Sequence, residues 1–64
     1  MITLTVTGMT CAHCVRAVDQ AIKALDPAAQ VQVDLAKGIV QATTTLSRDA
    51  VAAAIRAEGY GVAD

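Results

Sequence analysis

The chain changes its hydrophobic period at the stretch Gly8-Met9-Thr10-Cys11-Ala12-His13-Cys14. Before this stretch, residues 2–7 alternate between aliphatic and threonine side chains, which is typical of a half-buried strand. After it, apolar residues recur at helical spacing, at Val15, Val18, Ile22 and Leu25. The stretch therefore joins a strand to a helix, and it carries both cysteines and the single histidine of the chain.

A strand hairpin is predicted after the first helix. Asp26-Pro27 ends that helix, because the residue before a proline is pushed out of the helical conformation. Residues 31–35 and 39–45 then alternate as two strands around a turn at Gly38. The inward-facing side chains of the later strand are expected to be Val40, Ala42 and Thr44.

A second helix and a short closing strand complete the pattern. Ser47 is a good N-cap, and Gly59 is suited to the position just after the helix. The buried face of this helix is predicted to be Val51, Ala54 and Ile55. Residues 60–62 suffice for a last strand, so the element order is β-α-β-β-α-β.

This order predicts an α+β fold in which residues 1–64 form a single domain. Right-handed crossovers give a ferredoxin-like sandwich, with a four-stranded antiparallel sheet and two helices on one face. In that topology the loop after the first strand, the hairpin and the loop before the last strand share one end. Cys11 and Cys14 should lie near Gly59 and Tyr60, and more loosely near Lys37.

Composition excludes several classes of function. Hydrophobic residues make up 55% of the chain, which favours a folded domain, although its 64 residues predict only modest stability. The net charge is −1 with no basic cluster, so a nucleic-acid-binding surface is not expected. The longest apolar run, 50–55, is far too short to insert in a membrane, and residues 1–6 do not resemble a signal peptide. A chain complete as it stands would be cytoplasmic.

The thiol pair Cys11 and Cys14 suggests soft-metal chemistry. Cys14 is expected in the first turn of the helix and Cys11 just before it, where unpaired N–H groups and the helix dipole stabilise thiolates. Two thiolates on one turn can converge on an ion such as Cu(I) without another ligand. A site on an open loop also admits an incoming thiol, which suits metal transfer.

Other chemistries of the same pair remain open at this point. A structural zinc site needs four ligands, and His13 is the one further Cys or His in the chain. A dithiol oxidoreductase also places Cys-x-x-Cys between a strand and a helix, but its usual fold is longer than this chain. A structural disulfide is not expected, because closing so short a loop constrains the unfolded chain little.

The stretch Gly8-Met9-Thr10-Cys11-x-x-Cys14 resembles the signature of heavy-metal-associated domains. Residues 31–35 and 58–60 are also similar to segments of that family, so the resemblance covers nearly the whole chain. It implies a protein that is not an enzyme and that holds Cu(I) between the sulfurs of Cys11 and Cys14. It further implies, as for the bacterial copper chaperones of the family, delivery to the N-terminal metal-binding domain of a P-type copper ATPase.

The resemblance also implies roles near the metal for three other residues. Met9 matches a methionine that packs beneath the loop, and Tyr60 matches a tyrosine common near the metal in bacterial members. His13 lies at a variable, solvent-facing position, from which it would modulate the thiols rather than bind metal. Ag(I), Hg(II) or Zn(II) are expected substitutes for copper, and a domain of a Hg(II) or other soft-metal transport system is the alternative. Two facing sites would give a metal-bridged homodimer.

Overall fold

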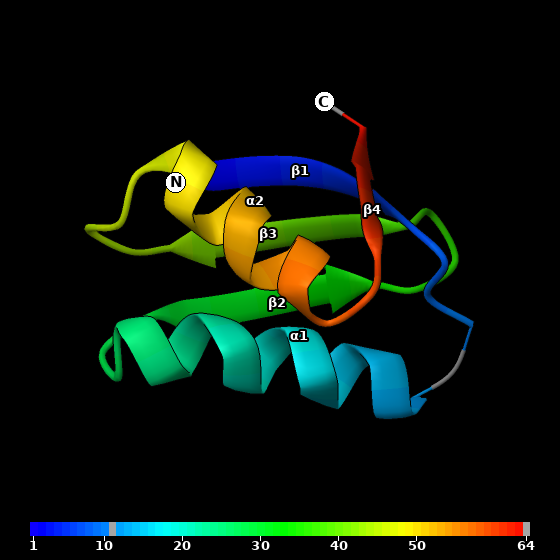
Figure 1. Cartoon of the computed structure of the whole chain (residues 1–64), viewed down its shortest axis with the longest axis horizontal. Helices are drawn as coiled ribbons and strands as arrows, with labels where there is room; N and C mark the ends of the chain where they lie inside the picture. The colour runs from blue at the N-terminus through cyan, green and yellow to red at the C-terminus, as the bar shows by residue number, and fades with distance from the viewer. Residues whose placement is uncertain (11, 64) are drawn as a thin grey trace.

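A computed structural model describes residues 1–10 and 12–63, which form four strands and two helices. Cys11 and Asp64 lie outside the described residues. The elements in chain order are β1 (Ile2–Thr7), α1 (Ala12–Leu25), β2 (Gln30–Asp34), β3 (Ile39–Thr43), α2 (Arg48–Ala57) and β4 (Gly61–Ala63), shown in Figure 1.

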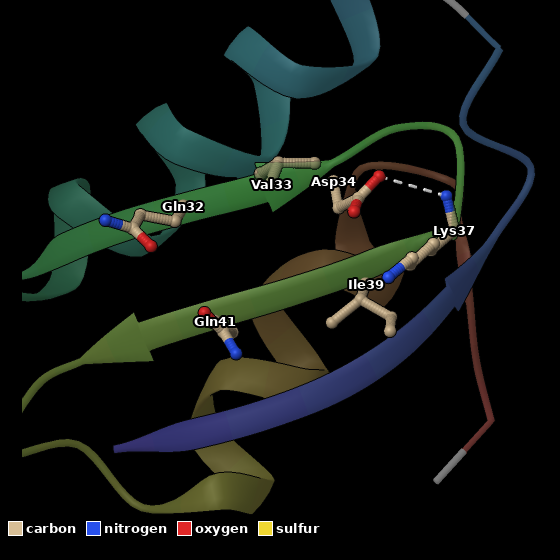
Figure 2. Close-up of a pocket in the computed structure, with 6 residues that line it drawn as sticks. All are labelled: Gln32, Val33, Asp34, Lys37, Ile39 and Gln41. Atoms are coloured by element: carbon tan, nitrogen blue, oxygen red, sulfur yellow. Dashed lines mark hydrogen bonds between the residues drawn. The ribbon is translucent and has the colours of Figure 1, made fainter.

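The strands form an antiparallel sheet in the order β2-β3-β1-β4, as the ferredoxin-like topology predicts. Leu4 lies opposite Val40 at the centre of the sheet, and Val6 lies opposite Val62. α1 and α2 cover one face of the sheet (Figure 1). In Figure 2 the other face is turned toward the viewer, with the helices behind it.

The core lies between the helices and the central strands. Its largest fully buried side chains are Leu4, Val18, Ile22, Val40, Val51 and Ile55. Alternation in β1 and β3 turns these aliphatic side chains inward, while the helical stripe of α1 supplies Val18 and Ile22. The core is therefore aliphatic, and Tyr60, the chain's single aromatic residue, packs at its margin.

β3 ends at Thr43, two residues earlier than predicted, because Thr44 leaves the sheet to form a turn. The Thr44 hydroxyl donates a hydrogen bond to Oδ2 of Asp26 at 2.6 Å. The same hydroxyl accepts the backbone N–H of Leu46 at 3.1 Å. The Thr44 side chain thus satisfies a backbone donor that has no partner in a neighbouring strand. Thr44 is therefore only partly buried, and the prediction that it faces the core was incomplete.

The prediction that Leu25 belongs to the buried stripe was wrong, since 55% of this residue is exposed. The chain turns back directly after α1, where the Ala29 N–H donates to the carbonyl of Asp26. Ala29, which this turn leads into β2, is instead buried, at 4% exposure. In α2, Val51 and Ile55 are buried as predicted. Ala52, which was not predicted to face inward, is also buried, whereas Ala54, which was, is only partly buried.

The signals at the ends of α2 were predicted correctly. Ser47 is the N-cap, and its hydroxyl accepts the N–H of Ala50 at 3.1 Å. Gly59 follows the C-cap residue Glu58 with a φ of 94°, in the region that favours glycine. The edge strands are each displaced by one residue, since β2 begins at Gln30 and β4 at Gly61.

Candidate metal site

The end of β1, the β2–β3 hairpin and the start of β4 meet at one end of the molecule, as the topology predicted. Thr7 lies opposite Gly61, and a Cβ atom on Gly61 would overlap Thr7 Oγ1. The Val6 N–H donates to the carbonyl oxygen of Gly38 at 2.7 Å. We call this the loop end, and it holds the segment 8–10 that leads into the cysteine motif.

Cys14 is the third residue of α1 and belongs to its first turn, as the sequence predicted. Its exposed fraction is 8%, so the residue is buried beneath the helix N-terminus. The first turn of α1 carries no acidic side chain among the described residues. Its backbone N–H groups and the helix dipole thus favour an anionic ligand such as a thiolate.

Met9 and Tyr60 pack against the hydrophobic core from the loop end, and both are partly buried. A Cβ atom on Gly8 would lie 3.7 Å from Cδ1 of Tyr60, so the backbone before the motif runs along the tyrosine ring. The ring therefore supports the loop that leads to Cys11, a residue outside the described part of the chain.

Polar side chains of both signs surround the loop end. His13 and Arg16 are exposed on α1, and Lys37 is exposed in the hairpin. The Lys37 N–H donates to Oδ1 of Asp34 at 3.1 Å, which fixes the hairpin turn (Figure 2). Because the charges are mixed, the loop end has no single sign that would select a strongly acidic or basic partner.

Within residues 1–10 and 12–63, no group of three or more His, Cys, Asp or Glu side chains converges on a common point. Of the two cysteines, Cys14 lies within the described residues. The same residues contain no helix long and apolar enough to cross a membrane.

Asp26 and Thr44 make the main contact at the opposite end of the molecule, and the sequence patterns had not linked them. The hydrogen bond from Thr44 lowers the pKa of Asp26 below its usual 3.8, aided by backbone N–H groups of Ala28 and Thr45 and opposed by partial burial. The contact joins residues 18 positions apart, so no local pattern reports it. Its role is to tie the α1–β2 loop to the β3–α2 loop.

A depression of about 310 Å³ lies on the open face of the sheet. It is lined by Gln32, Val33, Asp34, Lys37, Ile39 and Gln41, drawn in Figure 2. The depression is a consequence of leaving one sheet face without helices, and the periodicity of single strands did not predict it.

Residues 3–61 match the heavy-metal-associated domain family. The chain belongs to this family. The match covers both helices, β2, β3, nearly all of β1 and the first residue of β4, including the Gly8-to-Cys14 motif, and confirms the family resemblance of the sequence.

Relatives of this heavy-metal-associated domain extend over almost its full length. It is 41% identical to the copper chaperone CopZ of Bacillus subtilis, over 95% of this chain and 93% of CopZ. The solved structure of the copper chaperone Atx1 from Synechocystis, in its Cu2 form, superimposes with a TM-score of 0.95 at 36% identity, covering 98% of this chain and all of Atx1. A gold-binding protein superimposes with a TM-score of 0.90 at 32% identity, covering 97% and 95% of the two chains.

Proposed function

We propose that this heavy-metal-associated domain is a cytoplasmic metallochaperone that carries Cu(I) between the sulfur atoms of Cys11 and Cys14. It acts as a single domain of residues 1–64 and is not an enzyme. The observation that carries the proposal is the Cys-x-x-Cys pair at the N-terminus of α1, in a chain 41% identical to the copper chaperone CopZ. Its partner is the N-terminal metal-binding domain of a P-type copper ATPase.

The chemistry of the site suits a soft, monovalent ion. Thiolates prefer Cu(I) to hard ions, and two of them satisfy a linear site. The helix N-terminus offsets the excess negative charge of two thiolates around one positive ion. Burial of Cys14 keeps one side of the metal dry, while the loop position of the motif leaves the other side open to a partner.

Copper transfer then proceeds as ligand exchange with no change of oxidation state. A thiolate of the partner adds to the bound Cu(I), which becomes three-coordinate. One of the two cysteine sulfurs then leaves and takes up the proton that the partner's thiol released on becoming a thiolate. A second partner thiolate replaces the remaining sulfur, so each Cu–S bond that breaks is matched by one that forms.

Met9, Tyr60 and His13 modulate this exchange without binding the metal. Met9 and Tyr60 pack on the core beside the segment that leads to Cys11, and they limit the conformations of the loop. His13 is exposed between the cysteines and influences access from solvent. A His13→Ala variant should bind Cu(I) as tightly as the parent at every pH between about 6 and 8, because the side chain does not ligate the metal.

A competition titration with a chromophoric Cu(I) chelator, on reduced protein, tests the proposal. We expect one ion per monomer with a dissociation constant below the picomolar range, among the tightest non-covalent affinities. The double variant Cys11→Ser, Cys14→Ser should lose this binding, whereas the matched control Ser47→Ala should keep it. Stoichiometric, equally tight binding by the double variant would refute the assignment.

The partner is tested by transfer. Copper-loaded protein is mixed with the isolated N-terminal metal-binding domain of a P-type copper ATPase, and the two are separated to measure copper in each. We expect copper to distribute between them within the mixing time. Failure to transfer to this domain, with normal Cu(I) binding, would reject the partner and keep the metal site.

The similarity to a gold-binding protein favours a site that also accepts other soft ions. We therefore expect Ag(I) and Hg(II) to displace Cu(I) from the protein, which the chelator reports by binding the released Cu(I). Zn(II) should compete weakly, because it prefers four ligands. A domain of a Hg(II) or other soft-metal transport system, the second candidate, would instead prefer Hg(II) or another soft ion over Cu(I). A dithiol oxidoreductase would reduce insulin disulfides, and we expect no such activity.

A further inference from the structure

The outer edge of β2 is the least covered part of the core. The inward residues of β1 and β3, such as Leu4 and Val40, are 1% exposed, whereas Val31 and Val33 of β2 remain partly buried. Leu35, directly after β2, is exposed at 37%, and Leu25, the last residue of α1, is exposed at 55%. Val31, Val33 and Leu35 thus give β2 and its C-terminal end an apolar character.

The backbone of this edge is also open to another strand. In the order β2-β3-β1-β4, β2 pairs with β3 on one side, and no strand of the described residues lies on the other. Every residue from Gln30 to Asp34 has a partner in β3, so no bulge bends the strand away. The strand also contains neither proline nor lysine, the residues that commonly protect an edge.

We propose that β2 pairs antiparallel with β2 of a second copy of this chain, forming a continuous sheet across the two molecules without metal. The two-fold axis passes through Gln32, the middle residue of the strand. Gln30 then lies opposite Asp34 of the second copy, and Val31 lies opposite Val33. This register keeps the apolar side chains on the helix side and the polar ones on the open face.

The chemistry of this pairing is self-complementary. The amide of Gln30 can donate to the Asp34 carboxylate of the second copy, and no two like charges face each other in the strand. Beyond the strand, the antiparallel register brings the hairpin of one copy to the α1–β2 loop of the other. In the same register Leu35 lies opposite Ala29, and the amine of Lys37 approaches the loop that carries the Asp26 carboxylate.

The opposite edge does not offer the same surface. β4 has three residues, Gly61–Ala63, of which Val62 alone faces the core, so a strand added there would gain few hydrogen bonds and little apolar burial. The β2 interface is itself small, which predicts weak association, in the high-micromolar to millimolar range of concentration. It also directs the loop ends of the two copies in opposite directions, unlike a metal-bridged dimer.

Sedimentation equilibrium and concentration-dependent amide shifts in NMR test the proposal, on the metal-free Cys11→Ser, Cys14→Ser background with a chelator present. We expect dimerisation, with the largest shifts at residues 30–35. Adding Gln32→Lys places two ammonium groups together at the axis and should weaken dimerisation at least about tenfold. The control Gln41→Lys adds the same charge to the same face one strand inward, and should weaken it far less.

A charge swap separates loss of pairing from loss of folding. Gln32→Lys and Gln32→Glu should each be folded monomers, and their equimolar mixture should form a heterodimer at least as tight as the parent. Absence of concentration dependence in the parent, or shifts confined to residues outside β2, would overturn the proposal. So would a mixture that stays monomeric. None of these outcomes bears on Cu(I) binding, which the cysteine-intact protein reports separately.

Discussion

The two ends of the molecule are held together by different means. At the loop end the segments approach closely at glycines, with the Val6 N–H on the Gly38 carbonyl and Gly61 against the Thr7 hydroxyl. At the other end the Thr44 side chain joins two loops through Asp26, and the Ser47 hydroxyl caps α2. Close packing at glycine therefore matters most at the loop end, and side-chain hydrogen bonds of loop and cap residues matter most at the far end. The proposed metal site and the side-chain contacts between the loops thus occupy separate parts of a small fold.

Copper should stabilise the protein only through the loop end, and this is the largest effect that we expect. A metal buffer can hold the free Cu(I) concentration about a thousandfold above the dissociation constant. Binding then raises the free energy of unfolding by about 4 kcal/mol. Thermal unfolding with and without Cu(I) measures the shift. Cys14→Ser should abolish it, and Ser47→Ala at the far end should leave it unchanged. An equal shift in Cys14→Ser would contradict the division between the two ends.

The backbone contact at the loop end predicts the next largest effect, from Gly38→Ala. Gly38 has a φ of 68°, and a Cβ atom there would lie 2.8 Å from the Val6 carbonyl oxygen. Strain and displacement together should lower the free energy of unfolding by more than about 2 kcal/mol. Gly59→Ala is the matched control, since its φ of 94° gives strain but its Cβ would meet nothing within 4 Å. Urea denaturation should show a smaller loss for it, about 1 kcal/mol; equal losses would mean that the contact with Val6 is unimportant.

Removing a cap at the far end should have a moderate effect on stability. Ser47→Ala leaves the N–H of Ala50 without the hydroxyl that accepts it, and should cost about 1 kcal/mol. Ser47→Asp supplies another acceptor and should retain most of the stability. Urea denaturation measures the free energy of unfolding of the two variants. If Ser47→Asp were as unstable as Ser47→Ala, the hydroxyl of Ser47 would not act as a cap.

The smallest effect concerns pH. The hydrogen bond from Thr44 holds the pKa of Asp26 below 3.8, so the folded protein binds the carboxyl proton less readily than the unfolded chain. The stabilisation is therefore fully present above about pH 4 and is lost as the pH falls through the lowered pKa. Thr44→Val should raise the pKa of Asp26 toward its usual value, measured by NMR titration. Thr43→Val, on the neighbouring residue, should leave that pKa unchanged.

Sequence periodicity predicted those parts of the fold that local patterns determine. β1 follows from the alternation of residues 2–7, and both ends of α2 follow from Ser47 and Gly59. Periodicity failed to predict the positions whose conformation depends on contacts outside their own element. Thr44 lies outside the sheet, where it bonds to Asp26, 18 residues away. Leu25 is exposed and Ala29 is buried on either side of the turn that follows α1. No local pattern contains these contacts.

The candidate site was predicted to a similar extent. The spacing of Cys11 and Cys14 indicated soft-metal chemistry, and the topology placed Tyr60 at the same end of the molecule. The burial of Cys14 depends on α1 beginning at Ala12, before its apolar stripe starts. The roles of Cys11, Met9, His13 and Tyr60 in metal binding stay predictions, to be tested by the titrations above.

The short β4 has a kinetic consequence for the loop end. This strand has three residues and is held by β1 at the edge of the sheet, so it can detach through a local fluctuation that leaves the central strands paired. Tyr60 immediately precedes it and would move with it. We therefore expect a subglobal opening equilibrium to govern the Tyr60 ring, and the surroundings of Gly8 to exchange their amide protons faster than the core beneath them.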